Sequence, residues 1–225
     1  MMQMFTSTLY YYNKKVQCLS VPDQFFLTLI KLRQHKIKFE LSRMFCVSES
    51  TVTNIFVTWV NFMNVQWREI DLFPSRDLVK YFAPSDFKQK FPTTRIFIDG
   101  VECPVKKPSA PRAQQSTFST YKNRNTVKNL VGCTPGALVS YISPRYGGSV
   151  SDRQIIERSH IQISCDPGDS IMADKGHIER IIGLGKTYKI LTQPMTGPET
   201  NLSSEIIFIC YMLCNFRSSI VSKMA

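Results

Sequence analysis

Long hydrophobic runs are absent from this sequence. The longest, residues 206–214, is bounded by Glu205 and Asn215 and is well short of the ~18 residues that a membrane-spanning helix needs. The N-terminus also lacks the basic start and the small-residue cleavage site of a secretory signal peptide. We therefore expect no membrane association, and we expect residues 206–214 to form a buried core helix.

Patterned cysteines and histidines are missing as well. The seven cysteines are odd in number, no two are spaced as Cys-x-x-Cys, and the chain has only three histidines. A recognisable zinc finger or disulfide framework is therefore excluded, and reduced thiols typical of a cytosolic or nuclear protein are expected. The hydrophobic content of 43% excludes a disordered chain, and 225 residues can bury a core without such staples.

Acidic side chains are scarce, and residues 103–151 have none. The 17 Asp and Glu stand against 28 Lys and Arg, which gives a net charge of +11. The acid-free segment carries most of the basic surplus, interleaved with Tyr121 and Tyr141: Lys106, Lys107, Arg112, Lys122, Arg124, Lys128 and Arg145. Such a segment is typical of a surface that binds a phosphate backbone, and a solvated basic loop is the equal alternative.

Residues 21–75 predict three helices with a tight turn between the second and the third. Val21-Pro22-Asp23 indicates a helix start, and Ser48 is a favourable N-cap for the third helix. This helix-turn-helix candidate would present small polar side chains that can contact base edges: Ser50, Thr51, Thr53, Asn54 and Thr58. No Lys or Arg occurs between Arg43 and Arg68, so a simple packing module is the alternative.

The remainder predicts a short helix at 75–82 within a linker, followed by an α/β domain. Strands are expected at 95–98, 125–133, 137–142 and 170–173, the second and third as a hairpin. Helices are expected after Ser151, at 178–184 and at 203–219. The first and last strands end in Asp99 and Asp174, each followed closely by glycine. Converging carboxylates can hold Mg²⁺, and the alternative for each is a turn residue bonded to its own backbone.

Five short motifs in order carry a family resemblance. RIFIDGVECPV, STYKNRNTVKNLVGCTPGALVSYIS, YGGSVSDRQ, DSIMADKG and HIERIIGLGKTYKIL together resemble the PIF/Harbinger-type transposases and their host-domesticated nucleases. The resemblance covers roughly residues 20–220. It implies an α/β (α+β) fold with an N-terminal tail at 1–20, a transposase-type helix-turn-helix at 21–75 and a linker at 76–92. An RNase H-like mixed sheet flanked by helices would follow at 93–221.

The resemblance also implies a catalytic site. Asp99 would be the first acid of a DDE triad that binds Mg²⁺ or Mn²⁺, Asp174 in ADKG the second and Glu179 in HIER the third, with Asp152 as a support at the edge. The implied activity is metal-dependent cleavage of DNA phosphodiesters without a covalent intermediate. Expected DNA-binding residues come from both segments: Ser50, Thr51, Asn54, Lys106, Lys107, Arg112, Lys122, Arg124 and Lys128.

The expected partner is DNA, with a separate DNA-binding protein as a further partner. The expected compartment is the nucleus, with the cytoplasm second, and no oligomeric state is predicted.

One departure from the family affects the activity. Relatives have several tens of residues between ADKG and HIER, including a further strand and helix, whereas here Gly176 is followed directly by His177. Asp174 and Glu179 are therefore five positions apart. Five residues span at most ~17 Å, so the carboxylates can still be close, but the domain is truncated. Three hypotheses follow: an active DDE endonuclease, a catalytically inactive DNA-binding remnant, and a chain that does not fold stably.

Overall fold

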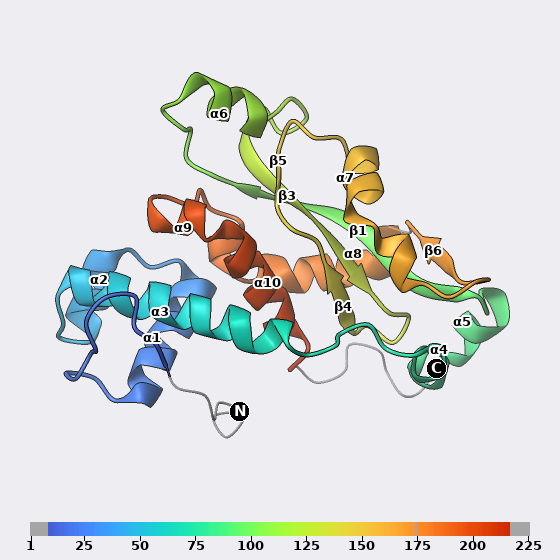
Figure 1. The fold of residues 1–225 in the computed structure, drawn as a ribbon, viewed down its shortest axis with the longest axis horizontal. Coiled ribbons are helices and arrows are strands. Elements are labelled where there is room, and N and C mark those ends of the chain that lie inside the picture. Colours follow the sequence, from blue (N-terminus) through green and yellow to red (C-terminus); the bar gives the residue numbers. More distant parts are fainter. Residues whose placement is uncertain (1–8, 174, 217–225) are drawn as a thin grey trace.

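The computed structural model describes residues 9–173 and 175–216. Three helices lie at one end of the molecule, and a curled mixed sheet flanked by helices forms the rest (Figure 1). The predicted α/β class is thereby confirmed, and this arrangement is consistent with an RNase H-like fold. The helices at the end are α1 (Val21–Gln34), α2 (Lys38–Met44) and α3 (Glu49–Arg68).

Serine caps set the beginnings of these helices. The Oγ atom of Ser20 accepts the N–H of Asp23 before α1, and that of Ser48 accepts the N–H of Thr51 at 3.1 Å before α3. Each bond satisfies a donor that the first helical turn leaves without a partner. His35 ends α1 in the left-handed conformation. The three predicted helices and the short turn before α3 are confirmed.

The segment between the two modules holds two short helices, where the sequence predicted one. The predicted helix is α4 (Arg76–Phe82), capped by Ser75, and the additional one is α5 (Ser85–Lys90). Phe87 of α5 is buried, with its ring centroid 5.2 Å from that of Phe97. The segment is therefore packed against the sheet over part of its length.

The sheet is built on β1 (Thr94–Pro104) and β3 (Arg124–Cys133), which are paired antiparallel along eight residue positions. The short strands β2 (Phe118–Ser119), β4 (Val139–Ile142) and β5 (Tyr146–Gly147) pair antiparallel with β3. β6 (Ser170–Met172) pairs parallel with β1 at the outer edge. The prediction that the first strand ends at Asp99 is wrong, because pairing with β3 extends it to Pro104.

The glycines after Tyr146 allow β5 and the turn that follows it to lie close against both α6 and β3. A Cβ atom on Gly147 would lie 2.1 Å from the carbonyl oxygen of Ser116, and one on Gly148 would lie 2.2 Å from Oγ1 of Thr126. No side chain fits at such distances. This close approach explains why glycine occupies both positions after Tyr146 in the motif YGG.

Helices cover both faces of the sheet. They are α6 (Pro111–Thr117), α7 (Asp152–Ser159), α8 (Lys175–Lys186), α9 (Pro198–Asn201) and α10 (Ser203–Cys214), with 3-10 turns at Ile161–Ser164 and Lys189–Leu191. α6 and α9 were not predicted. α10 is the predicted buried helix, although it ends at Cys214, and residues 217–219 of the prediction lie outside the described part. No helix among the described residues is long and apolar enough to cross a membrane.

Strand alternation divides the core in two. Phe97, Val101 and Cys103 of β1 belong to the larger cluster, which also includes residues of α8, α10 and α3. Ile96 and Ile98 point to the opposite face and join the smaller cluster with Ile155 of α7. Because α10 packs against both α3 and the sheet, one continuous core links the helix-turn-helix to the sheet.

Candidate functional site

Asp99 lies in the middle of β1 and is half-buried. Its Oδ1 accepts the backbone N–H of Gly100 at 2.7 Å. Alternation along β1 places Asp99 on the face that carries Phe97, against α8 and α10. Tyr211 of α10 is buried near this carboxylate: burial raises the pKa of its hydroxyl well above the usual value, and the charge of Asp99 contributes in the same direction. The surroundings of Asp99 are therefore only partly hydrated.

The other two expected acids are placed differently. β6 brings its last residue, Met172, opposite Phe97 of β1, and Asp174 follows two positions later in the sequence, outside the described residues. Glu179 is exposed in α8, the helix that packs on the Asp99 face of the sheet. Within the described residues no three or more His, Cys, Asp or Glu side chains form a group that could hold a metal ion. The convergence of the triad therefore stays a prediction.

Asp152 lies on the other face of the sheet. A Cβ atom built on Gly100 would be 3.3 Å from Oδ1 of Asp152, and the same oxygen is 3.4 Å from Nζ of Lys128. Because Gly100 and Asp99 are neighbours in a strand, their side-chain directions are opposite. Asp152, the first residue of α7, therefore lies on the face opposite the Asp99 side chain and pairs with Lys128. Its expected role as a support stays a prediction.

The expected DNA-reading face of α3 is partly covered. Ser50 is exposed, and Thr51 and Thr53 are half-buried. The outward orientation predicted for Asn54 and Thr58 is wrong, since they are only 9% and 1% exposed. Residues 9–16, called here the N-terminal arm, lie across them and form hydrogen bonds with both side chains. No local pattern in the sequence indicates this contact, which joins residues about forty positions apart.

The basic segment forms an exposed surface at the end of the sheet where β1 ends and β3 begins. Five of the six expected lysines and arginines are exposed: Lys106, Lys107, Arg112, Lys122 and Arg124. The exception is Lys128, which is half-buried and donates from Nζ to the carbonyl oxygen of Val150 at 3.1 Å as well as pairing with Asp152. Lys128 is thus committed to contacts within the protein, whereas the other five face solvent.

An open hollow lies within this surface, between α6 and the turn that joins β2 to β3. It has a volume of about 790 Å³, and none of the residues that line it is acidic. The charged lining residues are Lys107 and Arg124, and Gln114, Asn123 and Phe118 add amide groups and an aromatic ring. Cations beside amides and an aromatic face are the groups that bind phosphates, base edges and base faces.

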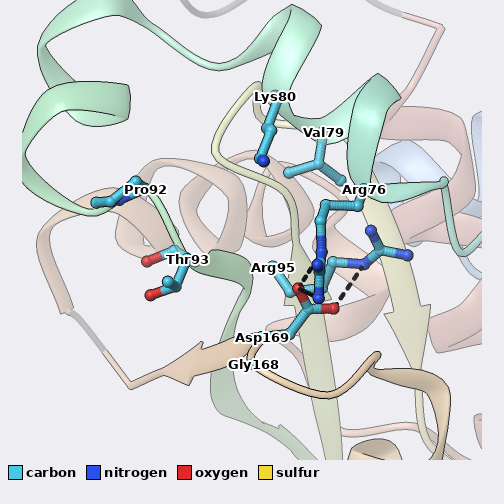
Figure 2. Close-up of a pocket in the computed structure, with 9 residues that line it drawn as sticks. Arg76, Val79, Lys80, Pro92, Thr93, Arg95, Gly168 and Asp169 are labelled. Carbon is cyan, nitrogen blue, oxygen red and sulfur yellow. Dashed lines mark hydrogen bonds and ion pairs between the residues drawn. The ribbon is translucent and has the colours of Figure 1, made fainter.

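An ion cluster that sequence reasoning missed joins α4 to the start of β1 (Figure 2). The guanidinium of Arg76 donates from Nε to Oδ1 of Asp169 at 2.8 Å, and Arg95 lies beside the same carboxylate, with Nε 3.7 Å from Oδ2. Asp169 and Arg95 are almost fully buried, and they line a small cavity of about 70 Å³. The cluster joins the residues before β6 to α4 and to β1, and thereby holds β6 at the edge of the sheet.

The structure thus places a helix-turn-helix before a mixed sheet that has a half-buried aspartate in its first strand. Two family models match the chain in agreement with this. Residues 17–69 match the helix-turn-helix of DDE superfamily endonuclease, and residues 98–177 match DDE superfamily endonuclease. No curated protein and no solved structure matches. The chain therefore carries both domains of a transposase-derived endonuclease of the DDE superfamily.

The limits of the matches bear on the expected residues. The endonuclease match includes Asp99, Asp152 and Asp174 and ends at residue 177, at the junction where ADKG meets HIER. Glu179 lies just beyond it. The helix-turn-helix match includes Ser50, and the N-terminal arm lies outside it.

Proposed function

We propose that the chain is a divalent-metal-dependent DNA endonuclease of the PIF/Harbinger type that acts in the nucleus. The observation that carries the proposal is Asp99, a half-buried carboxylate in the middle of the central strand, inside the segment that matches the endonuclease family. The exposed basic surface at residues 106–124 supports DNA as the substrate, since it presents cations without carboxylates.

A metal ion bound by Asp99, Asp174 and Glu179 is part of this proposal. The donor chemistry fits, because Mg²⁺ and Mn²⁺ prefer carboxylate oxygens and are commonly held by one or two of them together with substrate phosphates. The structure describes two of the three acids. Asp99 follows the part of β1 that pairs with β6, and Glu179 lies in α8, which packs on the face of the sheet that carries Asp99. When bound, such a metal would activate the attacking water and stabilise the leaving oxygen.

A catalytically inactive DNA-binding protein is the second candidate. Two observations favour an inactive protein. Glu179 is exposed, and β6 is the edge strand of the described sheet. Catalysis requires groups held to within about 0.5 Å, and an edge strand of three residues supports its neighbours weakly. DNA binding would persist in such a protein, because the basic surface does not depend on the triad.

Plasmid nicking in Mn²⁺ tests the proposal. We expect the chain to convert supercoiled plasmid to the nicked form and Asp99→Ala to lose this activity while keeping its DNA affinity. A second protein, with the family's missing segment inserted between Gly176 and His177, is assayed in parallel. Nicking by that protein alone would contradict the proposal and favour the inactive DNA-binding protein.

The hollow between α6 and the β2–β3 turn gives a separate prediction about DNA binding. The combined change Lys107→Gln and Arg124→Gln is expected to flatten the dependence of log affinity on log salt by about 0.9 for each phosphate that the protein no longer neutralises. The measurement is fluorescence anisotropy of a labelled mixed-sequence duplex over a salt series.

The matched control for this prediction is Lys88→Gln with Lys90→Gln in α5, which removes the same charge at the opposite end of the sheet from α6 (Figure 1). The control should leave the slope at its original value. Equal slopes for both double variants would place the DNA elsewhere than the hollow.

A further inference from the structure

The N-terminal arm follows α3 in the antiparallel direction. The backbone N–H of Tyr12 donates to Oγ1 of Thr58 at 2.9 Å, and that of Asn13 donates to Oδ1 of Asn54 at 2.9 Å. The side-chain amide of Asn54 in turn donates to the carbonyl oxygen of Lys14 at 2.7 Å. As the arm advances from Tyr12 to Lys14, its contacts therefore move one turn toward the N-terminus of α3.

Buried polar and apolar groups hold the arm in place. The hydroxyl of Tyr11 donates to Oε1 of Gln24 at 3.1 Å, and Nε2 of Gln24 lies 3.4 Å from the carbonyl oxygen of Val16. Gln24 is fully buried in α1, and Val16 belongs to the main core cluster. The arm is thus fixed at both ends and in the middle, by side chains of α1 and α3.

The solvent side of the arm is basic and aromatic. Lys14 and Lys15 are exposed, as are Tyr10 and Tyr12. Asn54, to which Lys14 is bonded, lies four residues from the exposed Ser50, about 6 Å along the helix axis. The N-terminal residues of a recognition helix are the ones that reach base edges in a helix-turn-helix complex. The arm therefore brings two lysines next to that end of α3.

These lysines supply what the helix lacks. Residues 44–67 contain no lysine or arginine, so α3 has no cation before Arg68, its last residue, and none near its N-terminal end for the phosphates beside a groove. Backbone contacts supply most of the affinity of a DNA-binding domain and fix its register. A cationic segment anchored on the helix can supply these contacts at little entropic cost, because its backbone is already ordered.

We propose that the N-terminal arm is part of the duplex-binding surface of the helix-turn-helix, with Lys14 and Lys15 contacting phosphates beside the bases that the first turn of α3 faces. This inference rests on the proposed DNA-binding function and adds a segment outside the part that matches the helix-turn-helix family.

The test compares full-length variants in anisotropy titrations with a labelled mixed-sequence DNA duplex. Lys14→Gln with Lys15→Gln is expected to lower the affinity at low salt roughly tenfold and to flatten the salt slope by about 0.9 per lysine. Lys88→Gln with Lys90→Gln removes the same charge from α5 and is expected to match the unmodified chain.

Release of the arm gives an independent measurement. Asn54→Ala removes the two hydrogen bonds of that side chain with the arm, together with the 3.5 Å bond that it accepts from Thr58, and leaves every charge in place. Thr58→Val removes the bond from Tyr12 and the bond to Asn54 with little change of shape. Each is expected to weaken DNA binding. The combined change Lys14→Gln and Lys15→Gln should then lower the affinity for the duplex less in the Asn54→Ala background than in the unmodified chain. Circular dichroism verifies that each variant is folded, and Thr58→Val serves if Asn54→Ala is not.

Three results would overturn the inference. If the chain binds duplex and the lysine variant matches it in affinity and slope, the arm is not a DNA contact although the proposed function stands. If the arm variants bind more tightly, the arm is a cover over α3. If the unmodified chain binds no duplex at low salt, the proposed DNA-binding function fails together with the inference.

Discussion

Asp99→Asn is expected to abolish stabilisation by Mg²⁺ or Mn²⁺ and to leave the unfolding of the metal-free protein nearly unchanged. Asparagine keeps the shape of the side chain and an oxygen that can accept the N–H of Gly100, now bonded at 2.7 Å. It removes the negative charge that a hard cation requires. The substitution therefore separates metal binding from the packing of the sheet.

The size of the effect follows from mass action. A ligand at one hundred times its dissociation constant stabilises the folded state by about 2.7 kcal/mol. For a chain of this length, that corresponds to a rise in Tm of roughly 5 to 10 °C. The measurement is a thermal melt of the full chain with and without Mn²⁺, and the expected result is a shift for the unmodified chain that disappears in Asp99→Asn.

Asp86→Asn is the control for this experiment, because Asp86 is exposed in α5 and belongs to no expected site. It should retain the full metal-dependent shift. An Asp99→Asn protein that is stabilised as strongly as the control would show that the metal binds elsewhere. The absence of a shift in the unmodified chain would favour the inactive DNA-binding protein.

Local hydrogen bonding explains which elements could be predicted from the sequence. Ser20, Ser48, Ser75 and Ser151 each cap a helix through an N–H three residues further on, so both partners stand together in the sequence. The turn residues Thr134-Pro135-Gly136 likewise indicated where β3 ends, at Cys133. These elements were predicted because their causes are local.

The features that were missed depend on contacts between distant residues. The length of β1 is set by its pairing with β3, and the burial of Asn54 is set by an arm about forty positions away. The cluster of Arg76 and Asp169 joins residues 93 positions apart. Asp152 lies on the face opposite Asp99 because α7 packs over Gly100, the neighbour of Asp99 in the strand. The sequence alone did not indicate where α7 packs. Motif order therefore identified the expected acids without placing their side chains.

Glu199 of α9 joins the helix-turn-helix to the part of the chain that forms the sheet and its helices. Its Oε1 is 2.6 Å from Nζ of Lys31 and its Oε2 is 3.2 Å from Nε2 of His35, both near the end of α1. Burial alone would raise the pKa of Glu199, but the hydrogen bond with His35 and the charge of Lys31 outweigh it and lower the pKa to about 2. The ionised carboxylate therefore favours the docked arrangement.

Glu199→Gln is expected to destabilise the protein by about 3 to 5 kcal/mol at neutral pH, because it leaves the ammonium of Lys31 buried without its countercharge. The measurement is urea unfolding of the full chain. The matched control is Glu157→Gln, which breaks an exposed pair with Arg153 on α7 and should cost less than about 1 kcal/mol. Equal losses for the two variants would contradict a stabilising role for the Glu199 contact.

The pH dependence of this difference has a definite sign. The folded-state pKa of Glu199 is lowered from 4.5 to about 2, so the stabilisation is complete above pH 4.5 and declines as the pH falls toward 2. The gap between the unmodified chain and Glu199→Gln should thus narrow by about 2 kcal/mol between pH 7 and pH 3. A gap that stays constant over this range would mean that Glu199 stabilises through its shape and hydrogen bonds, which glutamine retains in part, and not through its charge. Because this carboxylate joins α1 to α9, its protonation in acid should also loosen the helix-turn-helix from the sheet.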